Sequence, residues 1–177
     1  MASPEDKFLQ QLAKGEIENK ELIDKIGRIY EWDRAIAACL QTTPDIQETL
    51  SKSCDQETRR QVICNVITPT DVLITLAPQF PQEFFSHPLL DFFILEDPKF
   101  LSRLEPGVLK VFLSDPECPE GFVLWACRYG NKTDQLAILK RSDIKVEWLQ
   151  LIARWGVHPK PAEKAMDRLI VLGKSWL

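Results

Sequence analysis

The chain has 177 residues and a formal net charge of −4, and 45% of its residues are hydrophobic and 27% charged, which excludes a disordered chain. No window of about 18 apolar residues occurs, so we expect no membrane span. The first residues, MASPEDKFLQQL, are acidic where a signal peptide needs a basic and then an apolar start. We therefore expect one domain over residues 1–177, located in the cytoplasm.

Helices, and not strands, are expected along the whole chain. The sequence has only seven glycines and almost no alternating runs of Val, Thr and Tyr, which strands and their turns need. Six of the twelve prolines open or precede an apolar helical run, where helices tolerate proline. These six are Pro44, Pro69, Pro88, Pro106, Pro119 and Pro161.

Residues 1–30 are expected to form an N-terminal cap of two helices. Ser3 and Pro4 are followed by two acidic residues, which together are a helix start signal. A second helix follows Gly15, with apolar residues separated by many charged ones. Arrays of helical repeats need such a polar end to shield the first true repeat from water.

The stretch 55–77, DQETRRQVICNVITPTDVLITLA, predicts two short helices joined by a Thr-Pro turn. Proline disfavours helix in the residue before it but suits the first turn of a new helix, so we expect Thr68 as N-cap and Pro69 as the first residue of the second helix. The same pattern occurs one period upstream, where Thr43-Pro44 corresponds to Thr68-Pro69. The unit therefore repeats.

Residues 78–117 form an irregular, phenylalanine-rich middle. The richest apolar cluster of the chain runs from Phe80 to Leu95. Pro88 is expected to begin a helix that ends at Asp97-Pro98, and a short helix is expected over 106–113. We interpret the cluster as the thick middle of the core. The alternative is that some of the phenylalanines line an exposed groove for the apolar side chains of a partner.

Further copies of the unit follow. Cys118-Pro119 opens an apolar helix, and apolar runs at 136–139 and 146–153 flank a four-residue break. A spacing of about 25 residues is typical of solenoids, so we predict an all-α fold, a right-handed α-solenoid of repeats over 31–157. Residues 158–177 are predicted to be a C-terminal cap with a helix over 162–172, after which Trp176-Leu177 either folds back or stays free as a docking tail.

The pattern resembles the leucine-rich repeat variant family, whose unit has an Arg-containing helix, an Asn-Pro-x-Thr-Pro-like turn and a helix ending in Leu-x-x-Leu-Ala. The best match is 57–77, and weaker matches cover 32–50 and 119–153. The leading Asn-Pro of the turn is absent, because Asn65-Val66-Ile67 precedes Thr-Pro. This resemblance, or a more general one to HEAT-type repeats, implies a curved superhelix and no catalytic residues.

Charge is distributed unevenly along the chain. Residues 1–127 contain twelve basic and twenty-one acidic residues, whereas 128–177 contain ten and five. We interpret the basic third as a solvated face. The alternatives are that its cations lie along one edge and meet an acidic partner or a phosphate backbone, or that the chain associates with itself head to tail. Arg59, Arg60 and Arg128 are predicted on the inner curve. The candidate partner-binding residues are Arg59, Arg60, Arg128, Lys132, Lys140, Arg141, Lys145 and Arg154.

Catalytic, cofactor and metal motifs were not found in the sequence. His87 and His158 lie in no recognisable catalytic frame, and no glycine-rich phosphate loop occurs. Cys39 and Cys64 occupy equivalent points of adjacent repeats, which a small apolar residue at a recurring core position explains more simply than a metal site. The five cysteines are expected to be reduced thiols. We therefore expect no enzyme, cofactor or metal.

The predicted function is that of a non-enzymatic scaffold or adaptor that binds another protein on the surface of a repeat array. The alternative is nucleic-acid binding through the basic C-terminal third, with Trp125, Trp148 and Trp155 as stacking groups. A sequence pI near 5.3 disfavours this alternative.

Overall fold

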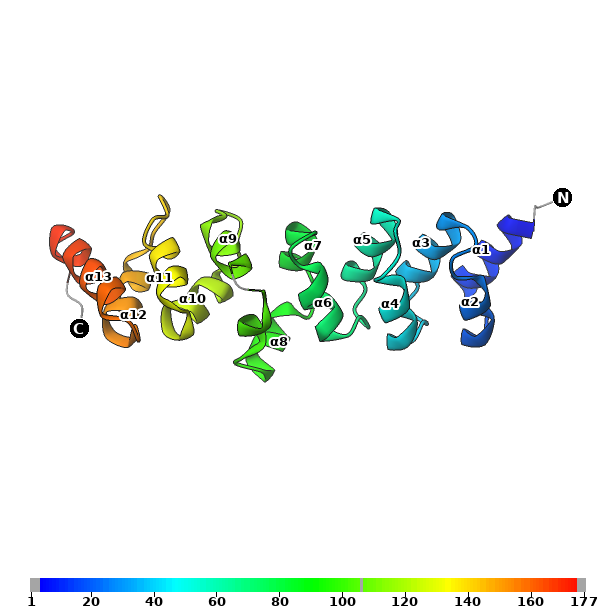
Figure 1. The fold of residues 1–177 in the computed structure, drawn as a ribbon, viewed down its shortest axis with the longest axis horizontal. Coiled ribbons are helices and arrows are strands. Elements are labelled where there is room, and N and C mark those ends of the chain that lie inside the picture. Colours follow the sequence, from blue (N-terminus) through cyan, green and yellow to red (C-terminus); the bar gives the residue numbers. More distant parts are fainter. Residues whose placement is uncertain (1–3, 106, 175–177) are drawn as a thin grey trace. The chain divides into compact units, whose positions relative to one another are not determined.

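The computed structural model describes residues 4–105 and 107–174, and over these residues the protein contains helices and no strand (Figure 1). The prediction of an all-α fold is confirmed. The α-helices are α1 (Pro4–Lys14), α2 (Asn19–Lys25), α3 (Tyr30–Ala38), α4 (Pro44–Leu50), α5 (Gln56–Cys64), α6 (Thr70–Leu76), α7 (Pro81–Phe85), α8 (Leu90–Glu96), α9 (Val108–Ser114), α10 (Glu120–Tyr129), α11 (Lys132–Ile138), α12 (Val146–Trp155) and α13 (Pro159–Val171). A 3-10 turn, η1 (Phe100–Arg103), follows α8. The expectations for Ser3, Pro106 and Trp176-Leu177 lie outside the described residues.

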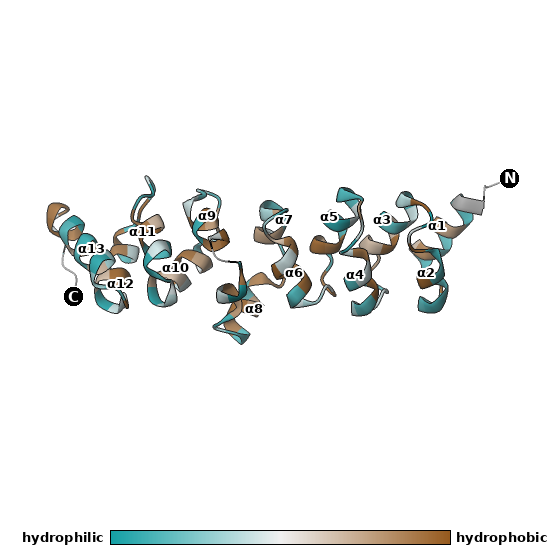
Figure 2. Cartoon of the chain, viewed as in Figure 1, coloured by the Kyte–Doolittle hydropathy of each residue, from teal (hydrophilic) through white to brown (hydrophobic). Residues whose placement is uncertain are grey.

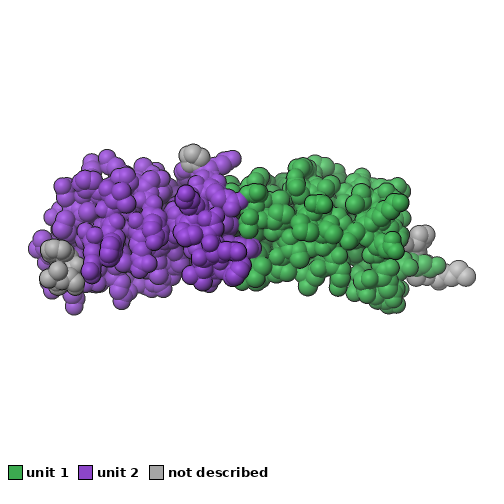
Figure 3. All heavy atoms as spheres, turned by 90° about the horizontal axis from the view of Figure 1, so that it is seen from below, with its two compact units in different colours: residues 1–90 green, residues 91–177 purple. Residues whose placement is uncertain are grey.

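The chain divides into two compact units, 1–90 and 91–177, coloured in Figure 3. In the first unit each odd-numbered helix packs on the next odd-numbered one, so that α1, α3, α5 and α7 form a row. The even-numbered helices α2, α4 and α6 pack against members of this row. The predicted single domain over 1–177 stays a prediction.

The second unit repeats this packing by itself. The helices α9, α11 and α13 form one row and α10 and α12 form another, and α10 also contacts α11 while α12 contacts α13. Within each unit, therefore, successive odd-numbered helices are neighbours, and in the second unit so are α10 and α12.

Helix starts keep the regular spacing that the sequence predicts. Among the even-numbered helices, the number of residues between successive helix starts is irregular only around α8. It is smaller than elsewhere from α6 to α8 and larger than elsewhere from α8 to α10. The odd-numbered helices are evenly spaced throughout, and they begin at Pro4, Tyr30, Gln56, Pro81, Val108, Lys132 and Pro159.

Apolar residues at helical spacing form the core of each unit. Ile36, Ile63 and Phe84 of the first row are fully buried, as are Ile138 and Leu169 of the row in the second unit. Most of α2 is hydrophilic (Figure 2), and Leu22 is its buried residue. Burying such side chains stabilises each helix by about 1.5–3 kcal/mol per large residue.

Side chains at the ends of odd-numbered helices bind the backbone carbonyls of the odd-numbered helix before them. In the first unit the amide of Asn65 donates to the carbonyls of Ala37 and Cys39, at 2.7 and 3.0 Å. His87 Nδ1 accepts from the Leu89 amide, so Nε2 carries the proton and lies 3.4 Å from the Asn65 carbonyl. Burial lowers the pKa of His87, which keeps the ring neutral.

The second unit has the same arrangement with arginines. Arg141 donates to the carbonyls of Leu113 and Asp115, at 3.0 and 2.6 Å. Arg168 donates to the Leu139 carbonyl at 2.7 Å. The last carbonyls of a helix have no partner inside it, so these bonds satisfy them. We call the contacts made by Asn65, His87, Arg141 and Arg168 the carbonyl ladder.

Several predicted helix boundaries are wrong. Thr68 is not an N-cap: its hydroxyl donates to the Val62 carbonyl at 2.6 Å, so it closes the end of α5. Pro69 is the N-cap residue, and the second helix begins at Thr70. The expected helix at Pro88 begins two residues later, at Leu90. Pro44 is the first residue of α4 as predicted.

An ion pair joins α3 to the start of α5. Arg34 donates to both carboxylate oxygens of Asp55 at 2.8 Å, and Asp55 also caps α5 by accepting from the Thr58 amide. The hydrogen bond from Arg34 holds the pKa of Asp55 well below its ordinary value.

We predict that Asp55→Asn removes a pH-dependent part of the stability. A carboxyl whose folded pKa is lowered stabilises the fold above its unfolded pKa, and this contribution is lost as pH falls towards the folded pKa. The variant should unfold at lower urea than the native chain at pH 7, and the difference should shrink below about pH 4. Asn still accepts from the Thr58 amide, so a difference independent of pH would contradict the role of the ion pair.

Gly130 and Gly156 end α10 and α12 in the same way. A Cβ at Gly130 would lie 2.5 Å from the Ala126 carbonyl oxygen, and a Cβ at Gly156 would lie against the Ile152 carbonyl oxygen. Both helix ends therefore require a residue without a side chain.

We predict that Gly130→Ala lowers the free energy of unfolding by about 1–3 kcal/mol, the usual cost of forcing atoms into a filled site. Gly121→Ala is the matched control on the same helix. Its Cβ would meet Asp91 Oδ1 at an ordinary 3.5 Å, and alanine favours helix by up to about 1 kcal/mol. In urea unfolding, the changes in free energy of unfolding caused by the two substitutions should have opposite signs. Equal changes would contradict the prediction, because they would show that the contact at Gly130 relaxes.

Candidate functional site

The two arginines predicted on the inner curve of the first unit are bonded within it. Arg59 donates to the Ser53 carbonyl at 2.6 Å and to Gln79 at 3.2 Å. Arg60 pairs with Glu57 and Glu83, each at 2.9 Å. These contacts tie α5 to its neighbours, and both side chains keep part of their surface exposed.

The six predicted cations of the second unit differ in their surroundings. Arg141 is buried, with 7% of its surface exposed, because it belongs to the carbonyl ladder and also pairs with Asp143 at 2.6 Å. Lys145 pairs with Glu120 at 2.6 Å and lowers the pKa of that carboxyl. Lys132 and Lys140 are exposed. Arg128 and Arg154 lie beside exposed aromatic side chains, as described next.

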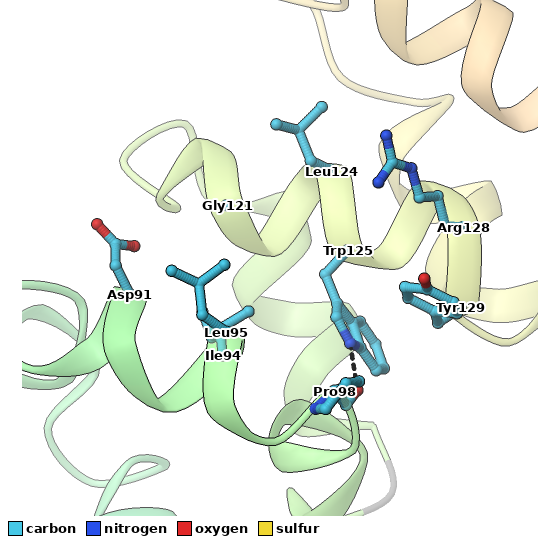
Figure 4. Close-up of a pocket in the computed structure, with 9 residues that line it drawn as sticks. All are labelled: Asp91, Ile94, Leu95, Pro98, Gly121, Leu124, Trp125, Arg128 and Tyr129. Carbon is cyan, nitrogen blue, oxygen red and sulfur yellow. Dashed lines mark hydrogen bonds between the residues drawn. The ribbon is translucent and has the colours of Figure 1, made fainter.

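A hollow of about 510 Å³ lies between α8 and α10 (Figure 4). Figure 4 shows Asp91, Ile94 and Leu95 on the α8 side, and Leu124 and Arg128 on α10. Gly121, Leu124 and Arg128 follow one another at helical spacing on this face of α10. The complete lining is Asp91, Ile94, Leu95, Pro98, Gly121, Leu124, Trp125, Arg128 and Tyr129.

The floor of this hollow is fixed by Trp125. Its indole N–H donates to the Pro98 carbonyl at 2.6 Å, which joins α10 to the segment after α8 (Figure 4). Its ring lies 5.9 Å from that of Tyr129. A tryptophan that is 8% exposed and hydrogen-bonded at its only polar atom is held rigidly.

A second hollow, of about 450 Å³, lies between α10 and the end of α12. Arg128, Tyr129, Trp155 and Val157 line it, and the guanidinium of Arg154 lies 5.2 Å from the Trp155 ring centre. Because Arg128 and Tyr129 line both hollows, the two form one continuous surface. We call it the α8–α10–α12 groove.

Large apolar side chains are unusually exposed in this groove. Leu95 is 81% exposed, Val157 71%, Tyr129 62% and Trp155 57%. Single exposed apolar residues are common on proteins, but a contiguous group of them marks a binding surface. Arg128 is also exposed, and its guanidinium forms no hydrogen bond or ion pair with any residue that the structure describes.

The described part of the chain contains few arrangements suited to metal binding or nucleophilic chemistry. No cluster of three or more His, Cys, Asp or Glu residues there has the arrangement to hold a metal ion. Burial raises the pKa of Cys118 and of Cys127 to about 12, so neither thiol is a ready nucleophile. The side chain of Cys64 is exposed, so the expectation that Cys64 occupies a core position is wrong. Asp134 lines another hollow, of 260 Å³, but it serves the capping box of α11.

Among the described residues, no helix is both long enough and apolar enough to span a bilayer.

Of the residues predicted to bind a partner or nucleic acid, Arg128, Trp125 and Trp155 line the groove and Arg154 lies beside it. The aliphatic lining of the groove and Tyr129 were not predicted. Of the three tryptophans considered for stacking, Trp125 and Trp148 are buried and only Trp155 is exposed. Leu124 and Tyr129 lie off the buried face of α10, and apolar residues in such positions were the available signal. Of the phenylalanine-rich cluster, Phe80 and Phe84 are buried whereas Phe92 is 56% exposed.

Comparison of the chain with models of known families, with curated proteins and with solved structures gave no match.

Arg141 is buried, so its hydrogen bonds to backbone carbonyls should stabilise the fold. We predict that Arg141→Leu lowers the free energy of unfolding by about 3 kcal/mol, because each buried carbonyl left without a donor costs about 1–3 kcal/mol. Lys140→Ala, which removes the exposed neighbouring cation, should change it by less than about 0.5 kcal/mol. Denaturant unfolding of both variants measures the two effects, and equal small effects would contradict a structural role for Arg141.

Proposed function

We propose that the protein is a non-enzymatic scaffold or adaptor that binds another protein in the α8–α10–α12 groove. The observation that carries this proposal is the continuous exposure of Leu95, Tyr129, Trp155 and Val157 around two hollows. Interfaces are enriched in Tyr, Trp and Arg, and such residues provide most of their binding energy. The rigid Trp125 between the hollows adds preorganisation, which lowers the entropic cost of binding.

We further propose that the helices form a right-handed α-solenoid of the kind that the leucine-rich repeat variant and HEAT-like resemblance implies. The even spacing of the odd-numbered helix starts supports it, as does the contact between helices two places apart within each unit. We place the protein in the cytoplasm, and its five free thiols fit a reducing compartment.

Nucleic-acid binding receives less support from the same surfaces. Binding of phosphate backbones needs several free cations, but Arg141 is buried and Lys145 is paired with Glu120. Base stacking needs exposed rings, and Trp125 and Trp148 are buried.

The proposal is tested with carboxylate substitutions at equally exposed valines. Val157→Asp places a charge in the groove, and Val111→Asp places one on α9, where Val111 is 67% exposed. A partner is first captured from native extract with the tagged native chain, identified, and then titrated against the purified variants. We expect Val157→Asp to weaken its binding at least about tenfold, as loss of an interface hot spot does, and Val111→Asp to leave it unchanged.

Leu95→Asp provides a second position at the other end of the groove. It should weaken binding of the same partner, because Leu95 is 81% exposed on α8. Equal affinity for all three variants would place the interface elsewhere and contradict the proposal, as would failure of the native chain to retain any protein.

A further inference from the structure

We infer that the α8–α10–α12 groove binds an acidic peptide segment of its partner, with a carboxylate flanked on both sides by apolar side chains. This inference rests on the proposed function and adds the chemistry of the ligand. In this arrangement the carboxylate meets Arg128, one apolar side chain fills the hollow beside Leu95 and Leu124, and the other contacts Tyr129 and Trp155.

The charge of the groove selects the carboxylate. Arg128 and Arg154 have no ion pair with a described residue, whereas Arg103 and Arg141 of the same unit pair with Asp97 and Asp143. A guanidinium offers a planar pair of donors that matches a carboxylate. Beside an apolar wall such a pair is less screened by water than on an open surface.

The position of Arg128 sets the order of the side chains. Arg128 lines both hollows, so a carboxylate bound to it lies between their occupants. Each hollow, of about 510 and 450 Å³, offers room for large apolar side chains. The pattern expected in the ligand is therefore apolar, acidic, apolar.

An acidic side chain on the α8 side of the groove disfavours binding of a polyanion. Asp91 lines the hollow on the α8 side (Figure 4), and its carboxylate repels a phosphate backbone that follows the groove. A peptide carries its negative charge at one point and meets no such penalty.

Selection of random linear peptides on the full chain tests the inference. We expect the enriched peptides to share the apolar, acidic, apolar pattern, and their fluorescence anisotropy titrations to weaken at least about tenfold with Arg128→Gln, since a charge-assisted hydrogen bond is lost. Lys132→Gln is the matched control, because Lys132 is also exposed but lines neither hollow. It should leave the affinity unchanged.

A charge exchange supplies the sharper test. Arg128→Glu should abolish binding of an enriched peptide, and replacing the peptide's acidic residue by Lys should restore it. Peptides that are lost with Val157→Asp but bind Arg128→Gln as tightly as the native chain would overturn the acidic ligand and leave the proposed function standing. Peptides indifferent to every groove variant, or no enrichment at all, would overturn both. Binding of a single-stranded RNA that Arg128→Gln removes, without peptide binding, would also overturn both.

Discussion

The structure depends on how its short helices satisfy their last carbonyl groups. Most of the helices are only two or three turns long, and in helices so short the unpaired end groups are a large fraction of the backbone. At the ends of α3, α5, α9 and α11 the carbonyl ladder supplies partners from outside the helix: Asn65, His87, Arg141 and Arg168 each bind the end of the odd-numbered helix before them. Packing of apolar faces brings the helices together, and these directional bonds fix which residues face each other.

The sequence predicted the all-helical fold and several of the helices because both follow from local signals, whereas α7 was not predicted. Proline at the first turn placed α4, and apolar residues at helical spacing placed α10 and α12. Thr68 was misassigned because the hydroxyl of a threonine before proline can either bond to the end of the preceding helix or cap the following one. The position of the Val62 carbonyl, which the sequence does not show, decides between the two.

The candidate site was harder to predict because its residues come from three helices. Leu95, Arg128 and Trp155 are far apart along the chain, and their proximity is a result of packing. Arg128 was selected for its charge and for its position near a predicted helix end. Arg141 was selected by the same rule, yet it is buried. A list of cations cannot distinguish an arginine that binds carbonyls inside the fold from one that faces solvent.

Gly130 and Gly156 follow successive even-numbered helices, and at both the backbone closes over the helix it has just left. Because neither residue has a Cβ, the backbone after each glycine can lie against the last turn of the helix before it. The floor and rim of the groove are carried by the helices that these two turns terminate. Tyr129 and Trp155 are the last residues of these two helices and directly precede the two glycines, so the helix ends that the glycines close also place the aromatic rings of the groove.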